Sequence, residues 1–252
     1  MQLWQALLIA LLGYLGANQT PWFFSTTGGW YVLGRPLVAG TLIGWILGDV
    51  QTGVLAGAAV QAMYIGLVTP GGAMPADINF AAYIGIPLAL VSNGSPEYAV
   101  TLALPLSFIG VAIFNLTMSL NAFFVHKGDK YAEEGNVKGI ALMNIMGTLP
   151  TFILRFSIIF LACYYGAPFA EELTQVMPEI LGKIFIALGG ILPSVGFALL
   201  LQQSLKENKM IVFYLLGFVI SASLNMTILS ITTLAIVIAV LDVAYRKEEA
   251  IQ

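Results

Sequence analysis

The sequence predicts an all-α, polytopic integral membrane protein with broken or re-entrant helices in its first half. Hydrophobic residues make up 59% of the 252 residues and charged residues only 9%, whereas about 25% of a typical soluble domain is charged. So few charges cannot cover the surface of a soluble protein of this size. Apolar runs follow one another along the whole chain, long in the second half and short in the first.

The long apolar runs predict membrane-spanning helices, because a span needs roughly 20 apolar residues. The last run has polar residues at its middle, "SASLNMT", and is therefore expected to form two shorter helices. We expect residues 99–245 to consist mainly of spanning helices. The four runs are Ala99–Val125, Ile140–Tyr165, Ile180–Leu201 and Met210–Ala244.

The short apolar pieces of residues 1–98 predict a different structure. Gly- and Pro-containing stretches such as "TPGGAMPAD" separate them. Irregular backbone at membrane depth is tolerated only where protein buries it or a wet cavity adjoins it, so short interrupted segments indicate a transporter binding site. The alternative is a set of ordinary short helices joined by surface loops. The pieces are Leu3–Leu15, Leu37–Leu47, Val54–Val68 and Phe80–Val91.

Composition and motifs exclude several classes of function. A net charge of −3 indicates no nucleic-acid partner, and the single cysteine, Cys163, excludes an internal disulfide. The chain has no phosphate-binding Walker loop, no dinucleotide fingerprint and no metal-ligand spacing. The one histidine, His126, lies beside Lys127 in a predicted loop. We therefore expect no catalytic residue, no metal and no cofactor.

Two charged residues of the first half are expected at helix starts. Pro36 favours the first turn of a helix, which places Arg35 at that helix's start, where the helix dipole opposes a positive charge. Arg35 is then an interface anchor or half of a structural ion pair, with direct ligand contact as a third alternative. Gly48 is expected to end this helix and Asp49 to cap the next one. Both charged residues would fix half-helices rather than contact a ligand.

Asp77 is the charge that most needs an explanation. It follows "PGGAMPA", which cannot be regular helix throughout, and precedes "INFAAYIGI", which can. It is therefore an N-cap or a ligand group in a membrane cavity, and the two roles are compatible. Asn79 lies nearby, and Gln61 is an amide within an apolar run. Such mixed donors and acceptors suit a polyhydroxylated ligand.

The candidate substrate-binding residues are thus Gln61, Asp77 and Asn79. Pro70, Gly71, Gly72 and Pro75 would shape the broken backbone that exposes them, as structural support of the site together with Arg35 and Asp49. Arg155 stands in the apolar stretch "TFILRFSII". A carboxylate partner and a contact with another subunit both remain open for Arg155.

The stretch "GRPLVAGTLIGWILGDVQTGVLAGAAVQAMYIGLVTPGGAMPAD" resembles the IIC membrane component of the mannose/fructose/sorbose/N-acetylgalactosamine family of bacterial phosphotransferase systems. The resemblance continues in "GDKYAEEGNVKGIALMNI", "GGILPSVGFALLL" and "FYLLGFVISASLNM", and covers nearly the whole chain. Two departures stand out. Many members carry glutamate where Gln61 stands, and in many proline directly precedes the aspartate, whereas here Ala76 separates Pro75 from Asp77.

The resemblance implies a sugar permease subunit for a hexose or an amino sugar, in which residues 1–252 form a single membrane permease domain of the bacterial inner membrane. Its implied partners are the IID membrane component, the soluble IIA and IIB phosphotransfer proteins, the sugar and membrane lipid, within an oligomer. Phosphoryl transfer would belong to those other subunits. Two alternatives stay open: a structural or assembly subunit that supports a partner's site, and an ion-coupled solute carrier.

Overall fold

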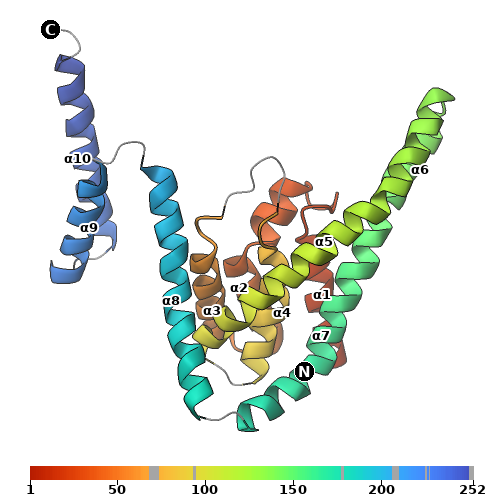
Figure 1. Ribbon diagram of the computed structural model, residues 1–252, viewed down its shortest axis with the longest axis horizontal. Helices are drawn as coiled ribbons and strands as arrows, with labels where there is room; N and C mark the ends of the chain where they lie inside the picture. The colour runs from red at the N-terminus through yellow and green to blue at the C-terminus, as the bar shows by residue number, and fades with distance from the viewer. Residues whose placement is uncertain are drawn as a thin grey trace. The chain divides into compact units, whose positions relative to one another are not determined.

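The computed structural model describes residues 1–67, 74–92, 95–176, 179–205, 210–224, 226 and 228–249. All regular secondary structure in these ranges is helical, as the composition predicts (Figure 1). The helices are α1 (Leu3–Leu15), η1 (Thr26–Leu33), α2 (Pro36–Leu47), α3 (Val50–Met63), α4 (Ile78–Val91), α5 (Pro96–Glu133), α6 (Val137–Met146), α7 (Thr148–Val176), α8 (Glu179–Ser204), α9 (Ile211–Leu224) and α10 (Ile228–Glu249).

The chain divides into two compact units, residues 1–200 and residues 201–252. In the second unit α9 packs against α10, and the polar break predicted within Met210–Ala244 separates these two helices. The first unit contains α1 to α7 and most of α8, and it holds every candidate site residue.

The first half contains the broken helix that its interrupted apolar pieces predict. The π-helical segment η1 and α2 meet at a bend of 69°. Arg35 occupies the N-cap position of α2 and Pro36 its first turn, as expected. The guanidinium carbon of Arg35 lies 5.0 Å from the ring centroid of Tyr31. The contact that this charge makes is therefore a cation–π contact with the preceding segment.

A tight turn joins α2 to α3. Gly48 has φ +90°, a left-handed conformation that glycine adopts without strain. Asp49 follows as the N-cap of α3, and its Oδ1 accepts a hydrogen bond from the Thr52 amide at 3.1 Å. Hydrogen bonds from the Thr52 side chain and backbone lower the pKa of the Asp49 carboxyl. Both predicted caps are confirmed, and α3 begins at Val50, directly after its cap, four residues before the apolar piece Val54–Val68.

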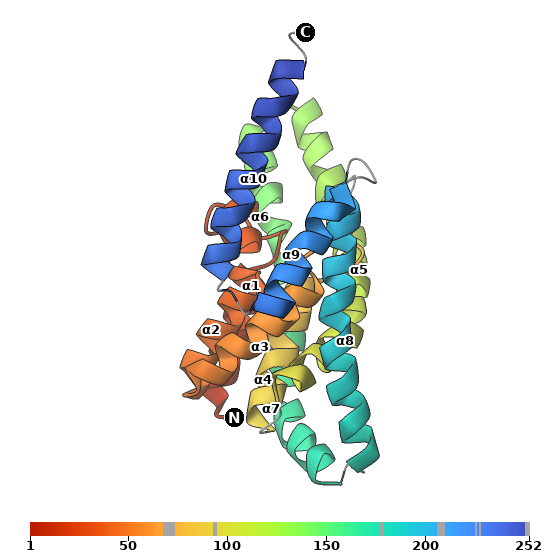
Figure 2. The ribbon, with the colours of Figure 1, turned by 90° about the vertical axis from the view of Figure 1, so that its left-hand side faces the viewer.

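Glycines line the contact between α2 and α3, two on each helix. A Cβ added to Gly57 would lie 2.5 Å from the Pro36 carbonyl oxygen, and one on Gly44 2.6 Å from the Asp49 carbonyl oxygen. Added Cβ atoms on Gly40 and on Gly53 would each collide with the other residue's carbonyl oxygen. The two backbones thus touch directly, which is how small residues let helices pair in membranes. Figure 2 shows the two helices side by side.

Helix α4 lies at the centre of the first unit and is almost entirely buried. It packs against α1, α2, α3, α5 and α7. The Tyr83 hydroxyl donates to the carbonyl oxygen of Leu33 at 2.9 Å, which ties α4 to the end of η1. Pro87 stands inside the helix. The position of α4 places its N-terminus, with Asp77 and Asn79, among other helices.

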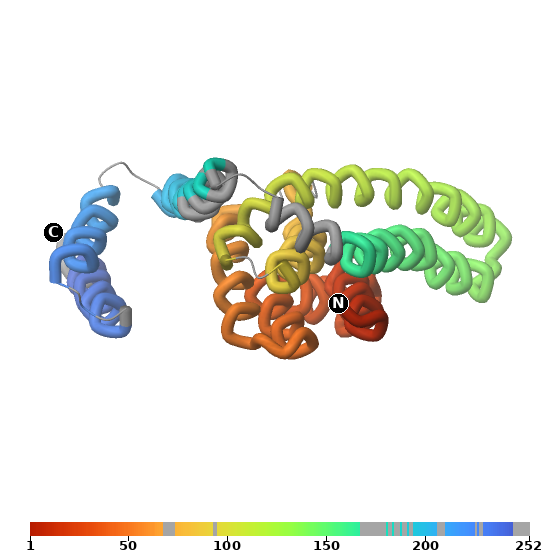
Figure 3. Tube along the Cα trace, turned by 90° about the horizontal axis from the view of Figure 1, so that it is seen from below, coloured from red at the N-terminus to blue at the C-terminus, as the bar shows by residue number. Residues whose placement is uncertain are grey.

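The two helices long and apolar enough to span a membrane, among the described residues, are α5 and the nearly continuous α6–α7 stretch Val137–Gly166. The bent η1–α2 pair is a third candidate if it is counted as one span. Helices α5 and α7 contact each other and are joined through α6 (Figure 3). Helix α5 runs on to Glu133, so the prediction of a loop at His126 is wrong. The charged residues there continue the helix.

Candidate functional site

Asp77 caps the N-terminus of α4, as the sequence predicts. Its Oδ1 accepts a hydrogen bond from the Phe80 amide at 2.9 Å, and its own amide donates to the Ser107 carbonyl oxygen at 3.2 Å. The residue has no exposed surface. A carboxylate at this depth requires a partner charge, because burial of an unpaired charge is strongly unfavourable.

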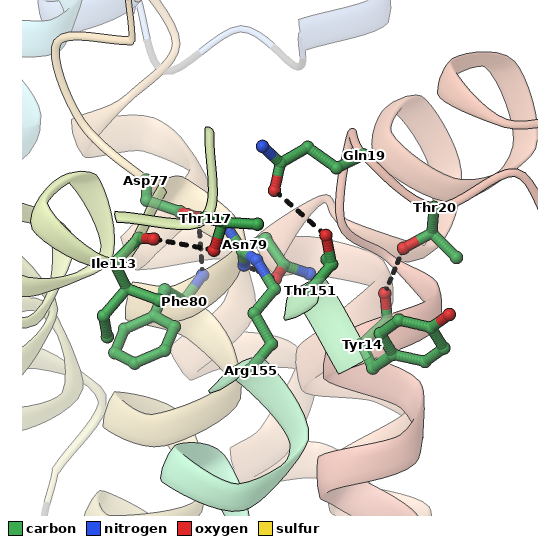
Figure 4. A network of polar contacts seen from close by, with 10 residues as sticks. All are labelled: Tyr14, Gln19, Thr20, Asp77, Asn79, Phe80, Ile113, Thr117, Thr151 and Arg155. Carbon is green, nitrogen blue, oxygen red and sulfur yellow. Dashed lines mark hydrogen bonds and ion pairs between the residues drawn. The ribbon is translucent and has the colours of Figure 1, made fainter. Parts of the chain in front are cut away.

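Arg155 of α7 supplies that partner charge. One terminal nitrogen of its guanidinium forms an ion pair with Asp77 Oδ2, and the other donates to Asn79 Oδ1 at 2.8 Å (Figure 4). Its guanidinium carbon also lies 5.8 Å from the ring centroid of Phe80. The Arg155 side chain is 1% exposed. Of the two partners left open for Arg155, the structure shows the carboxylate.

Space for this cluster comes from a glycine on α5. A Cβ added to Gly110 would lie 2.6 Å from Asp77 Cβ and 2.7 Å from Phe80 Cβ. These are main parts of the side chains rather than flexible ends, so neither can move aside without moving the start of α4. The close approach of α5 thus helps to fix the position of the Asp77 carboxylate.

Gly110→Ala is expected to destabilise the protein by about 1–3 kcal/mol, the usual cost of overpacking, and to reduce transport. The matched control is Gly128→Ala in the same helix, where the nearest atom to an added Cβ, Met143 Cβ, is 3.9 Å away. There alanine's better helix propensity should be neutral or stabilising. Thermal unfolding in detergent measures both. Equal midpoints for the two variants would contradict the packing role of Gly110.

Further polar side chains surround the cluster. The Thr151 hydroxyl, one turn before Arg155 on α7, lies 3.5 Å from Gln19 Oε1. Three buried polar atoms near the start of the chain and on α4 have no hydrogen-bond partner among the described residues: Asn18 Oδ1, Gln19 Nε2 and Asn79 Nδ2. Figure 4 shows Gln19, Thr151, Asn79 and Arg155 in one region. Buried polar atoms are nearly always paired, so these atoms are candidates to bind a ligand.

The structure brings together two of the three predicted ligand residues, Asp77 and Asn79, through Arg155. The third, Gln61, lies near the end of α3, and its buried Oε1 has no partner among the described residues. Pro75 is exposed just before α4. Pro70, Gly71 and Gly72 lie outside the described residues. Arg35 and Asp49 stand at the starts of α2 and α3. The side-chain contacts described for them, with Tyr31 and with Thr52, do not involve the Asp77 cluster.

Sequence reasoning did not assign Arg155 to the site. A lone arginine within an apolar run was the signal, since charges inside a membrane usually face a partner or a cavity. The described residues contain no group of three or more His, Cys, Asp or Glu side chains that could hold a metal ion.

Broken helices in the first half, long apolar helices after them and a buried ion pair at a helix start define a multi-pass helical membrane transport protein. A family model described as "PTS system sorbose-specific iic component" matches residues 3–241. The chain belongs to this family, the IIC components of the phosphotransferase system. It is a permease subunit and a multi-pass protein of the inner membrane.

Named relatives agree with the family. The chain is 32% identical over 184 residues to the N-acetylgalactosamine permease IIC component 1 of Escherichia coli (strain K12), covering 73% of this chain and 68% of the relative. It is 26% identical over 208 residues to the mannose-specific EIIC component of the same strain (82% and 78%). It is 28% identical over 221 residues to the sorbose-specific EIIC component of Klebsiella pneumoniae (85% and 82%).

Two solved structures share the fold. One, described as "Structure of membrane protein", has a TM-score of 0.81 at 22% identity and covers 97% of this chain and 96% of its own. The other is the cryo-EM structure of the mannose transporter ManYZ with microcin E492, with a TM-score of 0.56 at 22% identity and the same coverage. At this level of identity both similarities concern the fold alone.

Proposed function

We propose that this chain translocates a hexose or an amino sugar, and that residues 1–252 act as a single permease domain. Gln61, Asp77 and Asn79 would bind the sugar hydroxyls, with Arg35, Asp49, Pro70, Gly71, Gly72 and Pro75 supporting the site. The observation that carries this proposal is the polar cluster at the start of α4, buried within an apolar helical unit. The relatives named for mannose, sorbose and N-acetylgalactosamine support a sugar as the ligand.

The polar atoms of the three proposed ligand residues suit such a ligand. Asn79 Nδ2 is a donor and Gln61 Oε1 is an acceptor, both buried and without partners among the described residues. A sugar hydroxyl both donates and accepts, so it can satisfy either kind of atom. The Asp77 carboxylate has lone pairs beyond the two that accept from Phe80 and Arg155. It can therefore accept a sugar hydroxyl while the ion pair is kept.

The proposed partners are a IID membrane component and the soluble IIA and IIB phosphotransfer proteins, within an oligomer in membrane lipid. Phosphoryl transfer onto the sugar is assigned to those soluble proteins. The chain has one histidine, His126, at an exposed position of α5, and the proposal assigns it no phosphoryl group. The chain would then recognise and move the sugar without being phosphorylated.

The test is phosphoenolpyruvate-dependent phosphorylation of a panel of labelled sugars. Membranes would contain this chain with its IID partner, and the soluble phosphotransfer proteins would be added. We expect one or a few hexoses or amino sugars to be phosphorylated, and omission of this chain to abolish the signal. Asn79→Ala should reduce it at low sugar concentration, while Asn144→Ala, at an exposed position of α6, should not.

Two other outcomes would change the conclusion. A cysteine placed at Asn79 should be protected from labelling by the sugar that serves as substrate. If it were labelled equally with and without that sugar, the chain would be a structural subunit that supports a partner's site. Uptake of unmodified solute by the chain alone, driven by an ion gradient, would identify an ion-coupled carrier. A working permease of another sugar serves as the positive control in each assay.

A further inference from the structure

The orientation of the Asn79 amide is determined by its contact with Arg155. The two ends of an asparagine amide differ, since the oxygen only accepts hydrogen bonds and the nitrogen only donates them. A guanidinium has donors and no acceptor. The group that lies 2.8 Å from the Arg155 nitrogen must therefore be the amide oxygen, as the structure has it. The nitrogen of Asn79 then faces the other way.

That nitrogen is a buried donor without an acceptor. Asn79 has no exposed surface, and its Nδ2 has no hydrogen-bond partner among the described residues. A buried donor without a partner is unfavourable, so its retention needs a reason. The nitrogen lies beside the C-terminal end of α1, where a Cβ added to Gly16 would be 2.7 Å from it.

A second amide, that of Gln19, lies close to this junction. Thr151 can donate its hydroxyl to Gln19 Oε1, 3.5 Å away, and Gln19 Nε2 is buried without a partner among the described residues. Thr151 and Arg155 are four residues apart on α7 and so share one face of that helix. Both amides thus contact α7, but only Arg155, which has no acceptor, determines which end of its amide faces the helix.

We propose that Arg155 is a positioning residue for sugar recognition, in addition to being the counterion of Asp77. It holds the Asn79 amide so that the NH₂ group is presented to an acceptor oxygen of the sugar, a hydroxyl or an acetamido carbonyl. The inference rests on the proposed function, because it assigns a donor to the same site.

A purely structural role for Arg155 predicts different behaviour from a positioning role. A structural role would lower the amount of folded protein and the turnover, and it would leave the KM for the sugar and the discrimination between sugar analogues unchanged. A positioning role acts through Asn79, so the two substitutions should be non-additive. It should also change the sugar concentration needed for half-maximal rate rather than the maximal rate.

The experiment compares Arg155→Lys, Asn79→Ala and the double variant, each with IID and the soluble proteins. The substrate is a sugar that is phosphorylated when the wild-type chain is present. Lysine keeps a positive charge for Asp77 but lacks the planar fork that also engages Asn79. We expect a KM about tenfold higher for each single variant, about 1.4 kcal/mol, with kcat within twofold. The double variant should match Asn79→Ala, and Asn144→Ala should match the wild type.

Analogues of the sugar provide a second readout. Each analogue lacks one hydroxyl or the acetamido group. One of them should bind the wild type more weakly than the parent sugar does. This difference between analogue and parent sugar should disappear in Asn79→Ala and shrink in Arg155→Lys. Equal discrimination by all three proteins would overturn the proposal, as would additive effects on KM. If Arg155→Lys does not fold, Asn79→Asp takes its place: it keeps an oxygen that accepts from Arg155 but removes the NH₂ donor, so it should raise KM and lose the same discrimination as Asn79→Ala.

This design separates the inference from the function on which it rests. If no sugar were phosphorylated in the presence of the wild-type chain, its IID partner and the soluble proteins, the proposed function itself would be refuted. A wild-type chain that works, with an Arg155→Lys variant of unchanged KM, would refute only the positioning role. In both cases the rates are normalised to the amount of folded complex, which gel filtration in detergent measures.

Discussion

Asp77→Asn is expected to lower the free energy of unfolding by roughly 3–5 kcal/mol and to abolish most sugar phosphorylation. The cost follows from the Arg155 guanidinium, which would remain buried without a counterion. The helix cap would survive, because asparagine caps an N-terminus about as well as aspartate does. The substitution therefore isolates the charge pair from the cap. Thermal or denaturant unfolding in detergent measures the change, together with the phosphorylation assay.

The double variant Asp77→Asn/Arg155→Met is the control for this prediction. It removes both charges, so the stability lost in Asp77→Asn should largely return, whereas phosphorylation should stay low. Replacement of a buried ion pair by apolar groups is often neutral or stabilising. An Asp77→Asn protein as stable as the wild type would show that Arg155 finds another counterion or water in the folded protein, and that the pair does not hold α4 to α7.

Gly40→Ala is expected to destabilise the α2–α3 hairpin, although alanine is favoured over glycine in an open helix by up to about 1 kcal/mol. The added Cβ would collide with the carbonyl oxygen of Gly53. A backbone atom cannot rotate away, so the helices must separate, at a cost of about 1–3 kcal/mol or more. Gly53→Ala should behave in the same way because the two glycines face each other. Thermal unfolding and the yield of folded protein report the effect.

Gly217→Ala is the matched control. Gly217 lies within α9, and an added Cβ would meet no atom within 4 Å. Helix propensity is then the main change, and the variant should be as stable as the wild type or slightly more so. If Gly40→Ala and Gly217→Ala had the same unfolding midpoint, the close approach of α2 and α3 would not contribute to stability.

Much of the fold can be predicted from the sequence because it depends on local features. The predicted piece Leu3–Leu15 coincides with α1, and α2 and α4 differ from their predicted pieces only by a residue or two at the start. Asp49 and Asp77 cap helices as expected, since a cap connects residues only three positions apart. The apolar piece Val54–Val68 begins later than α3 because polar Gln51 and Thr52 follow the cap, so the cap locates the helix start better than hydrophobicity does.

The site is less predictable than the helices that carry it. Asp77 and Asn79 were identifiable as polar residues beside a broken backbone, but their partner was not. Arg155 is 78 residues away from Asp77 along the chain, and nothing in its apolar neighbours indicates which carboxylate it meets. The glycines of α2 and α3 are visible in the sequence as pairs four residues apart. Their pairing with each other follows only from the packing.

The sequence by itself determined the class of protein, the broken character of the first half and the starts of α1, α2, α3 and α4. These depend on composition and on hydrogen bonds within one turn of helix. The tertiary structure alone decided the charge pair, the orientation of the Asn79 amide and the place of Gly110 against Asp77. The physical reason is that membrane-buried charges and amides must be satisfied by whichever helices lie beside them, and adjacency of helices is a property of the packed molecule.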